Sequence, residues 1–460
     1  MYNDDAGRAR MNVSRRDFVA MVAGTLGAVH VPWRKQRPLP SRSQLEWQQD
    51  ELALFLHFGV NTFTDREWGE GNEDPGIFAP SSLDARQWAR VARAAGFRAL
   101  VLTAKHHDGF CLWPTRTTEH SVASSPWRGG GGDLVREFAD ACRAEDLRVG
   151  LYCSPWDRNA PSYGDSPRYN DLYCDQLTEL LTNYGPIHEV WFDGANGEGP
   201  NGRRQEYDWP RVWSLVRRLQ PDAVMFSDAG PDVRWIGNEA GVAGDPNWST
   251  VHPETVPVPG MSGDAVMRQL QHGDEDGTVW RPGETDVSIR PGWFHHPAED
   301  DRVRDADNLV DLFFTSVGRN SKLLLNVPPT RTGLLHETDA EMLAGMHRRL
   351  RAMFDENLAA SAERDWDAGS GTAKLELNLG RSVSAGIVEL REDIRHGQVV
   401  AGYVVEGWDG ASWRMLSRGT TIGYRKLDRC PRVEVSRVRV RIERALEIPR
   451  AVSLGVFRAG

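Results

Sequence analysis

A carboxylate directly follows a short aromatic run that has the composition of a buried strand. Asp193 comes after Val190-Trp191-Phe192 and precedes Gly194. A side chain in this position leaves an apolar strand and enters a pocket from a rigid element, which gives a nucleophile fixed aim and partial desolvation. The alternative is a helix-capping or ion-paired aspartate. We interpret Asp193 as a catalytic carboxylate.

A second carboxyl group is needed if Asp193 cleaves a glycosidic bond with retention. The two groups then lie about 5–5.5 Å apart, one as nucleophile and one as acid/base. The sequence offers four candidates, which are Glu67, Asp228, Glu239 and Glu254. Spacing alone does not choose among them. Glu239 follows the aromatic and apolar run Trp235-Ile236, where burial disfavours a charged carboxylate, so we predict Glu239 as the acid/base and Asp228 as the next candidate.

A histidine pair in the run Lys105-His106-His107-Asp108 has two interpretations. The histidines bind sugar hydroxyls, or they bind a metal ion together with Asp108. Adjacent residues on a strand point in opposite directions, and no H-x-H or H-x-x-x-H motif supports a metal. We favour hydroxyl binding and expect no metal and no cofactor.

Alternating strand and helix patterns surround these residues. The predicted strands span 52–60, 97–103, 148–154, 187–193, 223–227 and 322–327, and the predicted helices span 84–95, 133–145, 170–184, 209–219, 305–317 and 338–354. The strands are apolar throughout, as in a parallel sheet buried on both faces. We predict a (β/α)₈-like barrel, in which residues 230–297, rich in Gly, Pro and Trp, hide irregular units.

Barrel closure would gather polar side chains from distant parts of the chain. His57, His106, Tyr152, Asp193 and Asp228 lie at or near the ends of five predicted strands. Reactive residues of α/β barrels lie at the carboxyl ends of the strands. We therefore expect these groups to meet at one mouth.

The chain changes pattern near Trp366. Segments of alternating apolar and polar residues span 374–379, 383–390, 399–406, 414–419, 433–442 and 452–457. This pattern is typical of an antiparallel β-sandwich. We predict an export signal and linker over residues 1–40, the catalytic barrel over 41–358 and the sandwich over 359–460.

Composition excludes some classes of function. The net charge is −10 and no dense basic region lies beyond residue 40, so we expect no nucleic-acid partner. The five cysteines have no metal-ligand spacing and do not predict a disulfide scaffold. Arg15-Arg16, followed by a weakly apolar stretch, resembles a bacterial twin-arginine signal. We expect export to the periplasm or the exterior and no membrane span.

Several motifs together resemble the α-L-fucosidases of glycoside hydrolase family 29. They are His57-Phe58-Gly59, Glu67-Trp68-Gly69, the run 103–110 around the histidine pair, Tyr152-Cys153-Ser154-Pro155 and Trp191-Phe192-Asp193-Gly194. Their order and spacing fit from about residue 45 to 355, and the lysine-histidine-histidine-aspartate-glycine-phenylalanine run is highly specific.

The resemblance implies a retaining exo-mechanism on terminal α-L-fucose. Asp193 matches the nucleophile, Trp293 matches the aromatic residue that packs on the fucose methyl face, and the residues matching the hydroxyl-binding positions are His57, Glu67, Trp68, His106, His107 and Tyr152. The runs 235–239 and 286–295 resemble the branch that prefers α-1,3 and α-1,4 linkages, in which Glu239 matches the acid/base. The resemblance implies no catalytic metal and, as partner, a fucosylated oligosaccharide or glycoconjugate.

Three alternatives stay open at this point. One is a retaining barrel glycosidase that acts on another sugar. A second is a sugar-binding protein without turnover, although both carboxylates are present. A third is a metal-dependent deacetylase on the same barrel. The natural glycan and the oligomeric state are not readable from the sequence.

Overall fold

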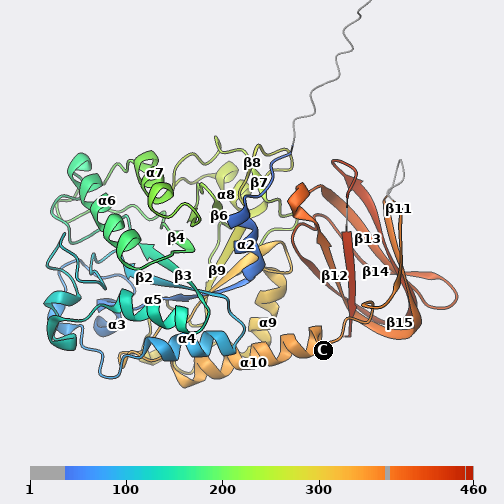
Figure 1. Ribbon diagram of the computed structural model, residues 1–460, viewed down its shortest axis with the longest axis horizontal. Coiled ribbons are helices and arrows are strands. Elements are labelled where there is room, and N and C mark those ends of the chain that lie inside the picture. Colours follow the sequence, from blue (N-terminus) through green and yellow to red (C-terminus); the bar gives the residue numbers. More distant parts are fainter. Residues whose placement is uncertain (1–36, 368–372, 451, 459–460) are drawn as a thin grey trace, which may run out of the picture. The chain divides into compact units, whose positions relative to one another are not determined.

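The computed structural model describes residues 37–367, 373–450 and 452–458. The twin-arginine-type run at residues 14–19 lies outside these ranges. The described residues form two regions, a barrel followed by a β-sandwich (Figure 1). This is the predicted fold class.

Eight parallel strands close into a barrel in the order β1-β10-β9-β6-β5-β4-β3-β2. They are β1 (Leu52–Leu56), β2 (Ala99–Lys105), β3 (Arg148–Cys153), β4 (Glu189–Trp191), β5 (Val224–Ser227), β6 (Val233–Trp235), β9 (Gly283–Ser288) and β10 (Ser321–Asn326). The pairing of Leu52 with Leu323 joins the first strand to the last.

Helices surround the barrel, and several of them begin at side-chain caps. They are α2 (Arg42–Asp50), α3 (Val60–Thr64), α4 (Ala85–Ala94), α5 (Leu134–Ala144), α6 (Ser166–Asn183), α7 (Trp209–Leu219), α8 (Asp264–His272), α9 (Ala306–Thr315) and α10 (Glu337–Phe354). Short 3₁₀ turns are η1 (Pro75–Ile77), η2 (Val122–Ser124), η3 (Trp127–Gly130), η4 (Pro297–Glu299) and η5 (Ile394–His396). Asp84, Asp133, Asp208 and Asp305 each accept a backbone N–H at a helix start, which satisfies a donor that the helix itself cannot.

Both faces of the barrel strands are buried, as predicted. Along β1, Leu52, Leu54 and Leu56 pack in the cluster under the helices, whereas Ala53 and Phe55 pack inside the barrel. The interior cluster also contains Tyr152 and Trp191. Because successive strand residues alternate between the two faces, every second side chain of a strand points into the barrel.

The irregular stretch 230–297 contains two barrel strands that the sequence patterns did not predict. Neither strand is continuously apolar, because β6 reads Val-Arg-Trp and β9 reads Gly-Glu-Thr-Asp-Val-Ser. Its Glu284 lies inside the barrel, where Lys322 Nζ lies 3.7 Å from Glu284 Oε2 and 2.9 Å from Glu189 Oε2. Between β6 and β9 the chain inserts β7 (Thr250–Val251), α8 and β8 (Val279–Trp280). No helix separates β5 from β6 in this described stretch.

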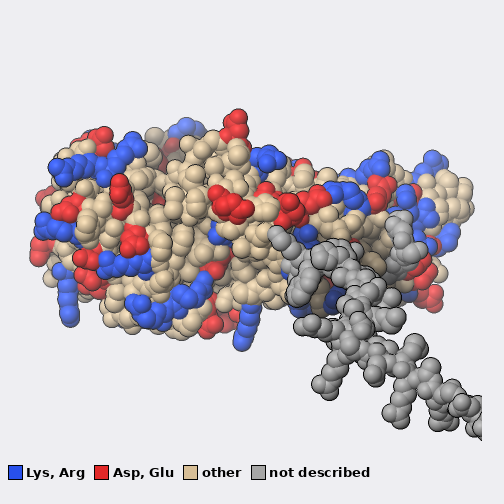
Figure 2. All heavy atoms as spheres, turned by 90° about the horizontal axis from the view of Figure 1, so that it is seen from above, with Lys and Arg blue, Asp and Glu red and all other residues tan. Residues whose placement is uncertain are grey.

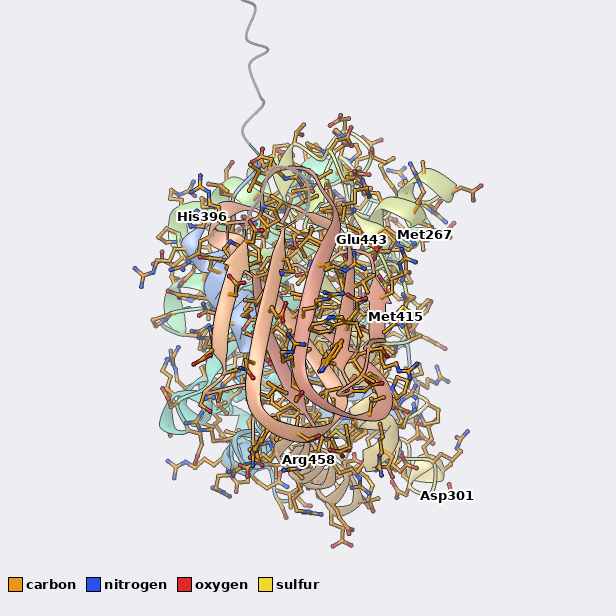
Figure 3. All side chains as sticks on the ribbon, turned by 90° about the vertical axis from the view of Figure 1, so that its right-hand side faces the viewer. Met267, Asp301, His396, Met415, Glu443 and Arg458 are labelled. Atoms are coloured by element: carbon orange, nitrogen blue, oxygen red, sulfur yellow. The ribbon has the colours of Figure 1, made fainter. Side chains whose placement is uncertain are left out.

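The C-terminal region is an antiparallel β-sandwich. Its strands are β11 (Glu363–Asp367), β12 (Lys374–Glu392), β13 (Val400–Trp408), β14 (Trp413–Gly419), β15 (Lys426–Ala445) and β16 (Val452–Phe457). The two predicted segments 374–379 and 383–390 are parts of the single strand β12, interrupted by a register shift between Asn378 and Val383. Figure 3 looks onto this region, where the edge strand β14 carries the exposed Met415.

Ion pairs and hydrogen bonds join the barrel to the sandwich. Arg425 and Arg391 of the sandwich pair with Glu51 at 2.6 and 3.3 Å. Asn247 N donates to Thr421 Oγ1 over 2.9 Å in a buried contact.

Acidic and basic side chains are interspersed over the face shown in Figure 2. The net charge of −10 is therefore not concentrated in one region of that face. Among the described residues, no helix combines the length and the apolar character needed to cross a bilayer. All five cysteines are free thiols, and four of them are buried.

Candidate active site

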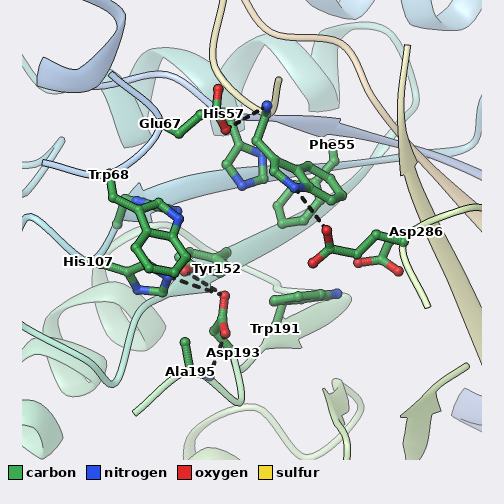
Figure 4. A pocket seen from close by; sticks show the side chains of 13 residues that line it. Phe55, His57, Glu67, Trp68, His107, Tyr152, Trp191, Asp193, Ala195 and Asp286 are labelled. Atoms are coloured by element: carbon green, nitrogen blue, oxygen red, sulfur yellow. Dashed lines mark hydrogen bonds and ion pairs between the residues drawn. The ribbon is translucent and has the colours of Figure 1, made fainter. Parts of the chain in front are cut away.

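All nine predicted site residues line one cavity of about 360 Å³ at the mouth of the barrel (Figure 4). They are His57, Glu67, Trp68, His106, His107, Tyr152, Asp193, Glu239 and Trp293. Phe55, Trp191, Ala195 and Asp286 complete the lining. Most of these residues lie in or just after barrel strands, so the closed barrel brings together groups that are far apart in the sequence.

Asp193 is held at both of its carboxylate oxygens. Oδ1 accepts a hydrogen bond from Ala195 N at 2.7 Å, and Oδ2 accepts one from the Tyr152 hydroxyl at 3.1 Å. His107 Nε2 lies 3.7 Å from Oδ2. The side chain is 24 % exposed, so it is fixed in direction and still open to the cavity.

Gly194 is required by a close approach beside this carboxylate. A Cβ atom on Gly194 would lie 2.5 Å from Asp228 Oδ2, which itself accepts a hydrogen bond from Gly260 N. Burial raises the pKa of Asp228 to about 6. Asp228 does not line the cavity, in contrast to Glu67 and Glu239.

Glu239 enters the cavity from a tight turn after β6. Gly237 has φ of +84°, a conformation that favours glycine, and Asn238 fixes the turn by donating to Val242 O at 2.9 Å. Burial raises the pKa of Glu239; a hydrogen bond from Trp293 opposes this shift and the charge of Asp193 adds to it. A carboxyl group with a raised pKa can hold a proton for a leaving group.

The remaining candidates for the second carboxyl group are engaged elsewhere. Glu67 lines the cavity, but its oxygens accept hydrogen bonds from the backbone N–H groups of Trp293 and Phe294 at 2.8 and 3.2 Å. Glu254 lies 3.5 Å from His252 and does not line the cavity. Glu239 is therefore the candidate whose position and protonation suit acid/base work.

His57 presents an unprotonated nitrogen to the cavity. Asn326 donates its amide N–H groups to Ser288 Oγ and to the carbonyl of Trp293, so its oxygen faces His57 Nδ1 at 2.9 Å and accepts a hydrogen bond from it. Burial lowers the pKa of His57 to about 3, so the ring is neutral. The Nε2 atom is then free to accept a hydrogen bond from a hydroxyl group.

His107 has the same tautomer for a similar reason. Ser154 Oγ donates to the carbonyl of Trp156 at 2.7 Å, so its oxygen accepts from His107 Nδ1 at 2.7 Å. Burial lowers the pKa of His107, although the charge of Asp193 opposes the shift. His106, whose pKa burial also lowers, stacks on Tyr152 with ring centroids 5.8 Å apart. The two histidines thus line the cavity as neutral rings.

A buried ion pair anchors the turn that carries these histidines. Lys105 Nζ donates to Asp157 Oδ2 at 3.0 Å and to Gln176 Oε1 at 2.8 Å, and its side chain is fully buried. His106 Nδ1 lies 3.9 Å from Asp108 Oδ2. Among the described residues, no group of three or more histidine, cysteine or acidic side chains is arranged to hold a metal ion.

Aromatic side chains form the walls and floor of the cavity. Trp68, which is 57 % exposed, packs edge-on against Trp156 and His107 at the rim. Trp191 stacks on Phe226 with centroids 4.2 Å apart and donates its indole N–H to Glu284 inside the barrel. Apolar walls with a few aimed polar groups are typical of small-molecule sites.

Asp286 is a fourth carboxyl group in the cavity, beside Glu67, Asp193 and Glu239, and the sequence did not single it out as a site residue. It is 4 % exposed and accepts a hydrogen bond from Trp235 Nε1 at 2.8 Å. Burial, together with the nearby charge of Glu239, raises its pKa well above the usual value. Because β9 has no continuous apolar pattern, its sequence carries no signal that Asp286 lies in a barrel strand.

The chain is similar to known glycoside hydrolases. The family model described as Alpha-L-fucosidase matches residues 73–353. A putative α-L-fucosidase 1 of Oryza sativa subsp. japonica is 45 % identical over 448 residues, which cover 91 % of this chain and 85 % of that protein.

Solved structures are similar over nearly the same length. A glycoside hydrolase 29 family member from an unknown rumen bacterium is 41 % identical with a TM-score of 0.86, covering 93 % of this chain and 78 % of that one. A Ruminococcus gnavus GH29 fucosidase in complex with fucose is 31 % identical with a TM-score of 0.83, covering 92 % and 95 %.

Proposed function

The chain belongs to the α-L-fucosidases of glycoside hydrolase family 29, and from this premise we propose that it releases terminal α-L-fucose by a retaining exo-mechanism. The observation that carries the proposal is the meeting of Asp193 and Glu239 in one cavity. A glycosidase for another sugar, and a sugar-binding protein without turnover, are not favoured, because the family model and the rice relative both carry the α-L-fucosidase description.

In the first step, an oxygen of Asp193 attacks the anomeric carbon while Glu239 gives its proton to the departing glycosidic oxygen. This forms the fucosyl-enzyme and leaves Glu239 ionised. In the second step, Glu239 takes a proton from water, and the water oxygen attacks the anomeric carbon and releases Asp193. The product keeps its configuration because two inversions occur.

We propose tasks for five of the other predicted residues. Unprotonated Nε2 atoms of His57 and His107 accept hydrogen bonds from sugar hydroxyls. The Tyr152 hydroxyl, which donates to Asp193 in the free enzyme, keeps that carboxylate in place. Trp68 and Trp293 provide the apolar walls for the ring faces and the methyl group.

We further propose a preference for α-1,3 and α-1,4 linkages on branched oligosaccharides. The two runs that resemble this branch both reach the cavity, through Glu239 in the first and through Asp286 and Trp293 in the second. Hydrolysis of 3-fucosyllactose should be compared with 2′-fucosyllactose and 4-nitrophenyl α-L-fucoside. Strong preference for 3-fucosyllactose supports the proposal, and equal use of all three would overturn it.

We also propose that the chain is exported through its N-terminal twin-arginine-type run. Arg15-Arg16 and the apolar residues after it support this assignment. Replacing both arginines with lysine should retain a fused reporter inside a bacterial host. If the reporter is exported equally well after this replacement, the export proposal is wrong.

A further inference from the structure

His296 bridges two loops at the rim of the cavity. Its Nδ1 lies 2.8 Å from Asp65 Oδ1, and its Nε2 lies 2.6 Å from Glu67 Oε1. Asp65 and Glu67 follow α3, whereas His296 follows β9. Carboxylate oxygens only accept hydrogen bonds, so both ring nitrogens must donate, and an imidazole does this only when it is protonated.

The bridge extends to groups that act on the substrate. Glu67, held by His296, accepts from the backbone N–H groups of Trp293 and Phe294. The Trp293 indole in turn donates to Glu239 at 3.3 Å, and the Trp293 carbonyl accepts from Asn326 at 2.8 Å. Asn326 also orients His57, so one network links His296 to both the acid/base and a binding residue.

The two loops also lie so close together at Gly292 that a larger side chain would not fit there. A Cβ atom on Gly292 would lie 2.4 Å from Glu67 Oε1 and 2.9 Å from the His296 ring. The far end of the first loop is fixed separately, because Asn159 donates to the Gly71 carbonyl at 2.8 Å. His296 therefore helps to hold the loop at Glu67, together with the backbone N–H groups of Trp293 and Phe294.

We propose that His296 is a positioning residue whose imidazolium ties the Asp65–Glu67 loop to the Trp293 loop and keeps the fucose-binding walls in place. The inference rests on the proposed function of the cavity. In the neutral ring one nitrogen carries a lone pair that faces a carboxylate, so one of the two contacts is lost. Substrate affinity then falls as the ring loses its proton, whereas the chemistry of Asp193 and Glu239 is changed less.

The charges that act on His296 come from Asp65 and Glu67 on the facing loop. Burial lowers the pKa of His296, but its hydrogen bonds to these carboxylates outweigh that effect, so the pKa is raised above 6.5. A raised pKa means that the bridge is complete at low pH and is lost as pH rises through that pKa.

The test compares kcat and KM for 4-nitrophenyl α-L-fucoside from about pH 5 to 9, with L-fucose affinity measured by calorimetry. In the wild type, KM should rise at alkaline pH. His296→Gln donates to one carboxylate only, so its KM should be about tenfold higher at acidic pH, as expected for a lost charge-assisted hydrogen bond. His296→Arg keeps a permanent charge and several donors, so its KM should stay low and vary less with pH.

His252→Gln is the matched control, because His252 also contacts two carboxylates, at 3.5 and 3.1 Å, and does not line the cavity. It should leave KM unchanged. If His296→Gln unfolds, Asp65→Asn tests the same bridge and should move the rise in KM to lower pH. A wild-type KM profile in both His296→Gln and Asp65→Asn would overturn the inference, whereas a wild type that cleaves neither 4-nitrophenyl α-L-fucoside nor 3-fucosyllactose would overturn the proposed function instead.

Discussion

The indole Nε1 of Trp293 lies 3.3 Å from Oε2 of Glu239 and donates a hydrogen bond to it. Trp293 comes from the loop after β9, and Glu239 from the turn after β6, which are neighbouring strands in the barrel. The bond holds Glu239, the proposed acid/base, in the cavity while burial disfavours its charged form. One side chain thus serves both as an apolar wall and as a control on the protonation of Glu239.

Trp293→Phe keeps the aromatic wall and removes this hydrogen bond. Because the bond lowers the pKa of Glu239, its loss should raise that pKa and move the alkaline limb of kcat/KM upward by about 0.5–1 pH unit. Glu239 must be protonated for the first step, so activity still falls as pH rises through the new value. Trp408→Phe, in the β-sandwich, is the control. If the alkaline limb of kcat/KM stays in place or moves to lower pH in Trp293→Phe, Glu239 is not the acid whose pKa this hydrogen bond lowers.

Glu239→Ala should slow the hydrolysis of natural fucosides by about 10²–10⁴-fold, because the leaving group is no longer protonated. An activated aryl fucoside still forms the fucosyl-enzyme, and added azide should intercept it and restore turnover. The product should be α-L-fucosyl azide, in which the configuration is retained. Failure of azide to rescue any activity on the aryl substrate would count against Glu239.

Asp286 should act as a neutral acid at neutral pH, because burial and the charge of Glu239 raise its pKa. Asn has nearly the same shape and still accepts from Trp235, so Asp286→Asn should keep most of kcat/KM near pH 7. Asp286→Ala leaves that indole N–H without its acceptor and should destabilise the fold by about 1–3 kcal/mol. If Asp286→Asn is as inactive as Asp193→Ala, the enzyme requires an ionised Asp286 and this prediction is wrong.

Lys105→Met should be strongly destabilising, because it leaves Asp157 buried without its cation. Breaking a buried pair in this way costs about 3–5 kcal/mol, and the loss should appear as a lower denaturant midpoint. Arg42→Ala, which breaks an exposed pair with Glu46, is the control and should leave the midpoint unchanged. Equal midpoints for the two variants would contradict the role given to Lys105.

Much of the barrel could be predicted because its strands and helices carry ordinary patterns. Asp193, His57 and Tyr152 were placed at one mouth because parallel strands end on the same side. β9 was not predicted, since the polar Glu284 breaks the apolar pattern and finds its partners, Lys322 and the Trp191 indole, on other strands. Such pairing inside a barrel leaves no local signal.

The contacts that hold the site together were also beyond prediction from spacing. His296 and Glu67 are 229 residues apart, and no pattern in either segment specifies their pairing. The tautomer of His57 depends on Asn326, which ends the last strand of the barrel. Residue type and position indicate which side chains reach the mouth, whereas the fold decides which of them donate and which accept.

The central claim is that Asp193 is the nucleophile, and azide rescue of Asp193→Ala tests it most directly. The variant should fold normally and hydrolyse aryl fucosides at a small fraction of the wild-type rate. Azide can then enter the space of the lost carboxylate and attack the anomeric carbon in a single inversion. Product analysis by NMR should show β-L-fucosyl azide, opposite to the product of Glu239→Ala. Near wild-type hydrolysis by Asp193→Ala, or an α-configured azide from it, would contradict the claim.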